Sequence, residues 1–273
     1  MFNVIRLFWW NEKRIQGKAK ENYGDLLGKY LVEKISAKKV VFAWPKKWSL
    51  LDYFSPIYVT IGSILTNVNH KCIVWGSGII SKEYPIKKAV FLAVRGPQTR
   101  AFLLKDGYEV PAVYGDPALL LPRYFNPIVT KKCKYGIVPH YDDYKIMAHW
   151  FQNNDSIRVI DLMTDDIESK TVELLECERI ISSSLHGIIV AHTYGIPAVW
   201  QRFSNKVFGD DIKYQDYFES VEMDGYKPEI QQECYTIAQM EDLFTVYPSL
   251  PNIEILELLR NGLMAVCPFK KMF

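Results

Sequence analysis

The stretch SSSLHGIIVAHTYGIPAVW, residues 182–200, joins an apolar strand to an apolar helix and then to a second strand. Apolar positions recur at the i, i+3, i+4, i+7 spacing of one helical face, at Leu185, Ile188, Ile189 and His192. Gly195 stands where a glycine commonly ends a helix, and residues 197–201 begin the next strand. The stretch therefore predicts a β-α-β unit, whose two strands run parallel in one sheet.

The small polar residues of this stretch lie where the first strand ends and the helix begins. Open α/β sheets bind ligands at this edge, and free N–H groups at a helix N-terminus attract anions. Ser182, Ser183 and Ser184 add hydroxyls, and His186 adds a charge or a proton. We predict a phosphate or carboxylate site here; the alternative is that one serine only caps the helix. His192 shares the apolar stripe, so we predict that it packs in the core.

The rest of the chain repeats this alternation of strands and helices. The candidate strands are 3–8, 38–43, 57–61, 71–75, 89–94, 111–114, 134–138, 157–162, 178–182 and 197–201. Such alternation predicts an α/β fold with parallel sheets flanked by helices. Three prolines within 117–130 resist both helix and central strand, so we place a domain boundary there. The prediction is one domain over 1–126, a second over 127–251, and an amphipathic terminal helix within 252–273.

Composition narrows the class of protein. The chain has 273 residues, 49% of them hydrophobic, and a net charge of only +2, which gives no reason to expect nucleic-acid binding. Five scattered cysteines predict reduced, buried thiols of a cytoplasmic protein. No apolar run is long enough for a membrane span. The paired acids are adjacent and diverge on a helix, and no His/Cys cluster occurs, so we expect no metal.

Several stretches, in matching order over residues 20–210, resemble the polysaccharide pyruvyltransferase family. The opening stretch is similar to that family's Ser-x-Arg-Leu-His-Gly hallmark and following Gly-x-Pro strand, which includes Leu185 and Gly187 here. The other similar stretches are ENYGD (21–25), IGSIL (61–65), WGSGI (75–79), AVRGPQTRAFL (93–103), GDPALLLP (115–122) and SNKVFGD (204–210). One position departs from the family pattern, because Ser184 stands where the family commonly has arginine.

The resemblance implies two Rossmann-like domains that face a cleft, as in GT-B glycosyltransferases, with the terminal helix packing back on the first. It implies transfer of pyruvate from phosphoenolpyruvate to two hydroxyls of a sugar, giving a cyclic ketal and phosphate, without a cofactor. The acceptor would be a surface polysaccharide or its lipid-linked precursor. We therefore expect a cytoplasmic protein, with peripheral association at the inner membrane face when the acceptor is lipid-linked. The acceptor sugar and the oligomeric state stay open.

An anionic donor needs several cations or helix termini. Besides the serine-rich junction, the candidates are Arg95, Arg100 and Lys206, with solvent exposure as an equal alternative for the last two. His186 is the candidate general acid or phosphate ligand, because histidine suits both proton roles near neutral pH. His140 follows strand 134–138 at the same edge, as a second cleft group or an ordinary loop histidine.

The first domain offers candidates for the acceptor side. Asn22, Gly24 and Asp25 open its first helix, either as caps or as acceptor ligands with Asp25 as general base. Glycine-rich turns after strands permit close approach of a ligand to the backbone, at Gly62, Ser63, Gly76, Ser77 and Gly78. The aromatic residues at positions 8–10 favour a core role over sugar stacking. His70 and His149 are predicted at the surface.

Two other functions stay open at this point. A GT-B glycosyltransferase would hold a nucleotide sugar's diphosphate at the same helix terminus, although the chain offers no convincing acidic partner for a ribose. A non-catalytic sugar-binding relative would fit the loss of the family's arginine at position 184.

Overall fold

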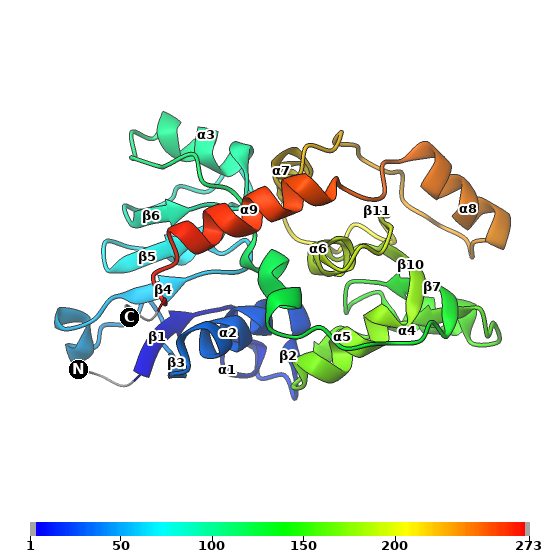
Figure 1. Cartoon of the computed structure of the whole chain (residues 1–273), viewed down its shortest axis with the longest axis horizontal. Helices are drawn as coiled ribbons and strands as arrows, with labels where there is room; N and C mark the ends of the chain where they lie inside the picture. The colour runs from blue at the N-terminus through cyan, green and yellow to red at the C-terminus, as the bar shows by residue number, and fades with distance from the viewer. Residues whose placement is uncertain (1–3, 271–273) are drawn as a thin grey trace.

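The computed structural model describes residues 4–270 and contains two parallel sheets (Figure 1). The first has the order β3-β1-β4-β5-β6, formed by β1 (Val4–Phe8), β3 (Lys39–Phe42), β4 (Ile57–Val59), β5 (Cys72–Trp75) and β6 (Val90–Ala93). The second has the order β11-β10-β7-β8, formed by β7 (Cys133–Val138), β8 (Ile157–Val159), β10 (Cys177–Ser182) and β11 (Ala198–Trp200). The chain thus has the predicted α/β class, in a two-domain arrangement like that of GT-B proteins.

The strand orders fix where each sheet can hold a ligand. In the first sheet, β3 lies on one side of β1, and β4, β5 and β6 follow one another on the other side. In the second sheet, β8 lies on one side of β7, and β10 and β11 lie on the other. The order therefore reverses between β1 and β4, and again between β7 and β10. A crevice opens at such a switch point, beyond the carboxyl ends of the two strands.

Helices cover both faces of the sheets (Figure 1). They are α1 (Glu12–Gln16), α2 (Tyr23–Ser36), α3 (Pro97–Lys105), α4 (Tyr144–Phe151), α5 (Ile167–Leu175), α6 (Leu185–Thr193), α7 (Ile212–Ser220), α8 (Ile237–Val246) and α9 (Ile253–Ala265). Three short 3₁₀ helices are η1 (Leu50–Tyr53), η2 (Leu65–Asn67) and η3 (Pro117–Arg123). Alternate residues of β7 and β10 face α4 and α8 on one side, and α5 and α6 on the other.

Several contacts join the two sheets into one body. The strands β2 (Glu21–Asn22) and β9 (Met163–Thr164) pair antiparallel, although they precede α2 and α5 on opposite sides of the predicted boundary. The largest core cluster includes buried residues of α2, η3, α5, α6 and α9. Helix α9 then runs across to the first sheet (Figure 1), where Leu263 packs beneath Trp75 and its carbonyl accepts a hydrogen bond from that indole. These contacts hold the two switch points in fixed relation.

The structure corrects some of the expected elements. Residues 111–114 form no strand; Tyr114 makes only an isolated bridge with Val94. The proline-rich segment includes the 3₁₀ helix η3, in which Pro117 takes the first position, where no N–H donor is needed, and Pro122 lies inside the helix. Ile253 is exposed, whereas Leu256, Leu259 and Leu263 are buried as the amphipathic pattern predicts. Predicted residues 3 and 271–273 lie outside the described residues.

Other expectations are confirmed. Helix α6 ends where Gly195 takes a left-handed conformation, with φ of 72°. His192 is fully buried, with its ring nitrogens 3.0 Å from the Tyr217 hydroxyl and from the Ala198 carbonyl oxygen. His70 and His149 are exposed.

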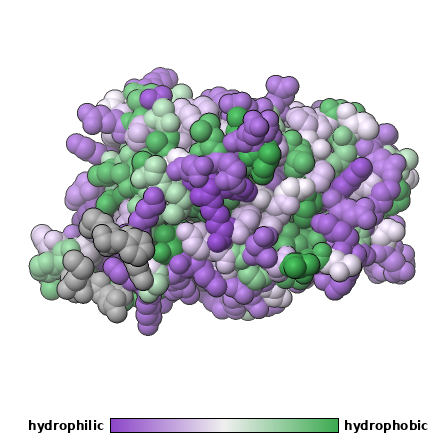
Figure 2. All heavy atoms as spheres, viewed as in Figure 1, coloured by the Kyte–Doolittle hydropathy of each residue, from purple (hydrophilic) through white to green (hydrophobic). Residues whose placement is uncertain are grey.

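The surface and the cysteines complete the description of the fold. Hydrophilic and hydrophobic side chains are interspersed over the face in Figure 2. Within residues 4–270, no helix has the length and apolar character that a bilayer crossing requires. All five cysteines are free thiols; Cys133 and Cys177 lie on neighbouring strands with their sulfurs 3.0 Å apart, and Cys234 is exposed.

Candidate active site

A cavity of about 530 Å³ lies where the two switch points face each other. From the first half it receives residues that follow β1 and β4, among them Trp10, Gly62 and Ser63. From the second half it receives residues that follow β7 and β10, among them His140 and Ser183. The site therefore arises from topology, because all four contributing strands present their carboxyl ends to it.

The N-terminus of α6 opens into this cavity. Ser184 takes the N-cap position, yet its side chain makes no capping hydrogen bond. Ser184, Leu185 and His186 all line the cavity. Within the described part of the chain, the first-turn N–H groups of α6 are thus left uncapped by Ser184, and the helix dipole adds positive potential at that point. The arrangement suits an anionic group.

The other two serines of the junction serve mainly to shape it. Ser182 is fully buried: its hydroxyl lies 2.9 Å from the Val138 carbonyl oxygen and accepts a hydrogen bond from the N–H of Ser184. Ser183 lines the cavity, while its hydroxyl accepts from the His140 N–H at 2.8 Å. Gly187 is not among the residues that line the cavity. It packs against Ser182, because a Cβ at this position would lie 2.5 Å from the Ser182 hydroxyl. Ser182 and Gly187 therefore support the site without reaching a ligand.

His186 is held tightly between the two halves. Its ring packs so closely on α2 that a Cβ at Gly24 would lie 2.0 Å from its Nδ1. Its Nε2 lies 3.6 Å from Oδ2 of Asp116. Only a glycine admits the ring at this point, which explains the need for Gly24 better than a direct ligand contact does.

Asp25 lies on the first turn of α2 and lines the same cavity. Burial raises the pKa of Asp25 to about 7, against the opposing effect of the nearby His186. A carboxyl group with a pKa near neutrality exchanges protons readily at the pH of the cell. Asn22 also lines the cavity, and its side chain caps α2 by accepting from the Gly24 N–H at 3.0 Å.

His140 faces these residues from the second half. Burial, followed by the positive charge of Lys213, lowers the pKa of His140 to about 4. Its imidazole is therefore neutral near pH 7 and contributes hydrogen bonds rather than charge. Its Nδ1 lies 3.4 Å from a carboxylate oxygen of Asp142.

Lys213 is a cavity residue that the sequence reasoning missed. It lies in the first turn of α7 and lines the cavity together with Asp25 and His140. Burial, followed by the charge of Arg95, lowers the pKa of Lys213 to about 8. It supplies a cation to the cavity that Ser184 also lines. The signal for Lys213 in the sequence is its place a few residues after SNKVFGD, but the basic residue within that stretch is Lys206.

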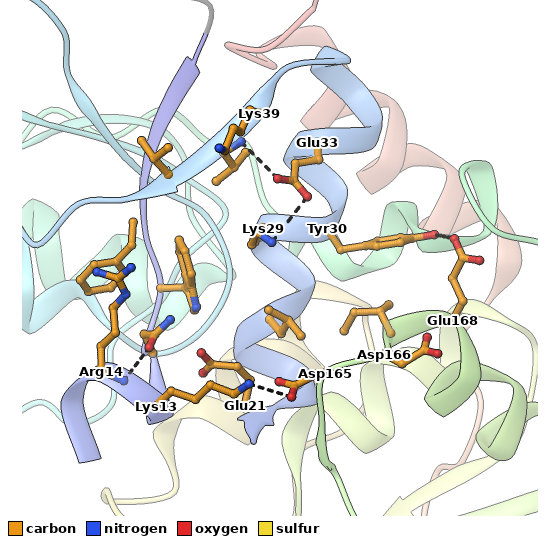
Figure 3. Close-up of a pocket in the computed structure, with 17 residues that line it drawn as sticks. Lys13, Arg14, Glu21, Lys29, Tyr30, Glu33, Lys39, Asp165, Asp166 and Glu168 are labelled. Carbon is orange, nitrogen blue, oxygen red and sulfur yellow. Dashed lines mark hydrogen bonds and ion pairs between the residues drawn. The ribbon is translucent and has the colours of Figure 1, made fainter. Parts of the chain in front are cut away.

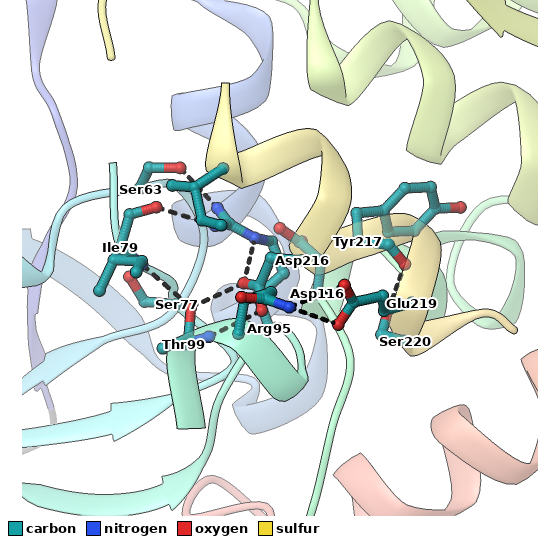
Figure 4. Close-up of polar contacts among 12 residues, drawn as sticks. Ser63, Ser77, Ile79, Arg95, Thr99, Asp116, Asp216, Tyr217, Glu219 and Ser220 are labelled. Carbon is teal, nitrogen blue, oxygen red and sulfur yellow. Dashed lines mark hydrogen bonds and ion pairs between the residues drawn. The ribbon is translucent and has the colours of Figure 1, made fainter. Parts of the chain in front are cut away.

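Arg95 has a different place from the one expected. Its side chain is fully buried and is not among the cavity-lining residues. It donates to Asp216 of α7 at 2.9 Å, to the Ile79 carbonyl at 2.9 Å, and to the Ser63 hydroxyl (Figure 4). Asp216 also accepts from the N–H and hydroxyl of Thr99. Arg95 therefore fixes Ser63 and the helix that carries Lys213, instead of contacting a ligand directly.

Other predicted ligands also lie away from the cavity. Arg100 donates to the Val110 carbonyl at 3.0 Å, and the half-exposed Lys206 pairs with Asp143 at 3.4 Å. In the second glycine-rich turn, Gly76 packs on Pro117, Gly78 packs on Arg95, and the Ser77 hydroxyl donates to the Gly62 carbonyl. This turn supports the first glycine-rich turn from behind.

The first glycine-rich turn does reach the cavity. Gly62 has a φ of 100°, and a Cβ there would lie 3.3 Å from a carboxylate oxygen of Asp25. Phe8 and Trp9 are buried as a core role predicts, whereas Trp10 is half-buried and lines the cavity. Trp10 is thus the residue of positions 8–10 that a ligand in the cavity could contact.

A second, larger cavity of about 990 Å³ lies on the other side of α1, between α2, β3 and the start of α5 (Figure 3). Two of its acidic side chains are held by neighbours: Lys13 pairs with Asp165 at 2.7 Å, and the Tyr30 hydroxyl donates to Glu168 at 2.7 Å (Figure 3). None of residues 182–187 lines it. The smaller cavity is therefore the candidate active site.

Comparison with known proteins identifies the family. The family model described as polysaccharide pyruvyl transferase matches residues 9–201, a span that contains most of the cavity-lining residues. An uncharacterized protein of Acanthamoeba polyphaga mimivirus is 34% identical over 223 residues, covering 76% of this chain and 74% of its own length. The chain therefore belongs to the polysaccharide pyruvyl transferase family.

Proposed function

We propose that the protein transfers the pyruvyl group of phosphoenolpyruvate to two hydroxyls of one sugar, in a surface polysaccharide or its lipid-linked precursor. The observation that carries the proposal is the uncapped N-terminus of α6, which opens into a cavity that also holds Lys213 and His186. A donor with a phosphate and a carboxylate needs such a set of N–H groups and cations. Work at the inner face of a membrane is part of the proposal when the acceptor is lipid-linked.

In the proposed reaction, one sugar hydroxyl adds to C2 of the donor, and a proton adds to its methylene carbon. The second hydroxyl then attacks C2, and the bond to the phosphate oxygen breaks. The two hydroxyl protons end on the new methyl group and on phosphate, so that the products are a pyruvate ketal and inorganic phosphate. No metal or other cofactor takes part in this scheme.

The residues divide these tasks by position and charge. The α6 N-terminus, Ser184 and Lys213 would hold the donor's anionic groups. His186 would deliver or accept the proton, because histidine changes charge near neutral pH. Asp25, with a pKa near 7, would accept a hydroxyl proton from the sugar. Trp10 would stack on the acceptor from the end of β1.

The direct test is phosphate release from phosphoenolpyruvate with a panel of galactose, glucose, mannose and N-acetylmannosamine glycosides. We expect release only with a suitable acceptor, with a ketal methyl signal in the product's NMR spectrum. Calorimetry with UDP- and GDP-sugars is the counter-test. Tight binding of a nucleotide sugar without binding of phosphoenolpyruvate would overturn the proposal in favour of a glycosyltransferase, and sugar binding without either donor would indicate a non-catalytic relative.

A further inference from the structure

We propose that Asp116 and His186 act as a dyad, in which the Asp116 carboxylate holds the Nε2–H of His186 and so leaves Nδ1 to serve the reaction. Asp116 would be a positioning residue, and the proposal rests on the proposed function only for the use that the reaction makes of Nδ1. It is carried by two buried polar atoms that face each other.

The first of these atoms is Oδ2 of Asp116. Asp116 follows Gly115 and forms the N-cap of η3, where its Oδ1 accepts from the Ala118 N–H at 2.9 Å. The side chain is 1% exposed, and Oδ2 has no hydrogen-bond partner within residues 4–270. A buried carboxylate oxygen without a donor is uncommon, because burial removes its water without replacement.

The second atom is Nε2 of His186, which is likewise buried and without a hydrogen-bond partner in the described part of the chain. It lies 3.6 Å from Oδ2 of Asp116. This distance exceeds a hydrogen bond by about 0.7 Å, taking ~2.9 Å as usual for N–H···O. Catalytic hydrogen bonds are often long without substrate and shorten when it binds. The Nε2–H of His186 is therefore a donor, and Oδ2 of Asp116 an acceptor, that each lack another partner and can bond to each other.

The packing leaves the ring little choice of orientation. Gly24 contacts the ring at Nδ1, on the side toward α2. The charged and titratable groups that face His186 are Asp116 before η3, Asp25 on α2, Lys213 on α7 and His140 after β7. Asp116 is the carboxylate that comes within 4 Å of a ring nitrogen. It therefore decides which nitrogen carries the proton in the neutral ring, as second partners of functional histidines commonly do.

The test is the tautomer of His186, measured by ¹H–¹⁵N NMR in the parent and in Asp116→Asn. Asparagine keeps the size of the side chain and an oxygen for the Ala118 cap. We expect the parent's neutral ring to carry its proton on Nε2, and this preference to be lost in the variant, since the carboxylate oxygen that accepts the proton is replaced. His186→Gln assigns the signal.

Asp166→Asn is the matched control, because Asp166 also caps a helix through its carboxylate, at α5, and lines the larger cavity instead of the one that holds His186. It should leave the tautomer unchanged. A parent ring protonated on Nδ1, or an unchanged tautomer in folded Asp116→Asn, would overturn the dyad. If the variant does not fold, the tautomer of the parent alone decides.

The same two variants separate the dyad from the proposed function. The expected tautomer change in a protein that never releases phosphate from phosphoenolpyruvate would keep the dyad and overturn the function. If the function holds, turnover of Asp116→Asn should fall by about tenfold to a hundredfold with its pH profile displaced. A turnover change without displacement of the profile would contradict the positioning role.

Discussion

The two cavities on either side of α1 differ in how their charges are treated, and this difference identifies the site better than size does. In the larger cavity the carboxylates already have donors: Lys13 pairs with Asp165, the Tyr30 hydroxyl donates to Glu168, and a backbone N–H donates to Glu21. In the smaller cavity, the α6 N-terminus is uncapped, and the pKa values of Asp25 and Lys213 are displaced toward neutrality by burial. Groups held in an unfavourable state are typical of sites that await a ligand.

The comparison also extends to the two buried cations near the smaller cavity. The guanidinium of Arg95 is hydrogen-bonded to Asp216, Ser63 and the Ile79 carbonyl. Lys213, in contrast, lines the cavity. Arg95 therefore supports the wall of the cavity, and Lys213 is placed to contact a ligand. The variants Arg95→Ala and Lys213→Met test this division.

The largest expected effect is on folding. Arg95→Ala leaves Asp216 buried without its ion-pair partner, which costs about 3–5 kcal/mol of unfolding free energy. Urea denaturation measures it. Arg100→Ala is the control, because Arg100 is half-buried and donates to one carbonyl. Equal, small losses for both variants would show that Arg95 is not a structural residue.

His186→Ala should reduce turnover by about a hundredfold or more while the protein stays folded, because proton transfer by a positioned side chain contributes that much. Steady-state phosphate release and circular dichroism measure the two quantities. His149→Ala is the control, since His149 is exposed on α4. A stable, fully active His186→Ala would mean that the site is misassigned.

Lys213→Met keeps an apolar stem and removes the cation. We expect the affinity for phosphoenolpyruvate to fall by about tenfold or more, the value of one charge-assisted hydrogen bond. Calorimetry measures the binding constant. Lys206→Met should leave it unchanged, because Lys206 pairs with Asp143 away from the cavity. A loss of affinity in Lys206→Met but not in Lys213→Met would assign the cationic role to Lys206.

Asp25 gives a prediction on pH. Its pKa is raised to about 7 in the folded protein and is about 3.9 in an unfolded chain. The folded state therefore binds the extra proton between these values, and the Asp25 contribution to stability is lost as pH rises through this window. Between pH 4.5 and pH 7.5, the unfolding free energy of Asp25→Asn should therefore rise relative to that of the parent by at least about 1 kcal/mol, which is the value of one pKa unit. Urea denaturation at both pH values would refute this if the gap stayed constant.

The smallest effect belongs to the larger cavity. Lys13→Ala removes an ion pair whose side chains are 41% and 52% exposed, so the unfolding free energy should change by less than about 1 kcal/mol. The affinity for phosphoenolpyruvate should stay the same. A clear loss of donor affinity would move the ligand to that cavity.

Local pattern was enough to predict much of the fold and half of the site. The 3.6-residue period of α6 and the short apolar strands are local, so the α/β class, the β10-α6-β11 unit and the ligand edge followed from the sequence. Because residues after neighbouring parallel strands share one sheet edge, His140 and His186 could be predicted together at the edge of the second sheet, whereas the expectation that Asp25 faces the same cleft came from the family resemblance.

The remainder depends on contacts between distant segments. Arg95 could not be recognised as structural, because its partner Asp216 lies 121 residues away. Lys213 looks like any surface lysine of a helix until the packing of α7 buries it. Strands β2 and β9 have two residues each, too few to show a period. Asp116 appears in sequence as a turn residue before proline, and only the fold brings it to His186.

A crystal structure of the protein with phosphoenolpyruvate bound tests the central claim most directly. We predict that an oxygen of its phosphate or carboxylate accepts hydrogen bonds from the first-turn N–H groups of α6, with Lys213 and His186 within reach of the same molecule. Phosphoenolpyruvate bound in the larger cavity, with the end of α6 left unoccupied, would contradict the account.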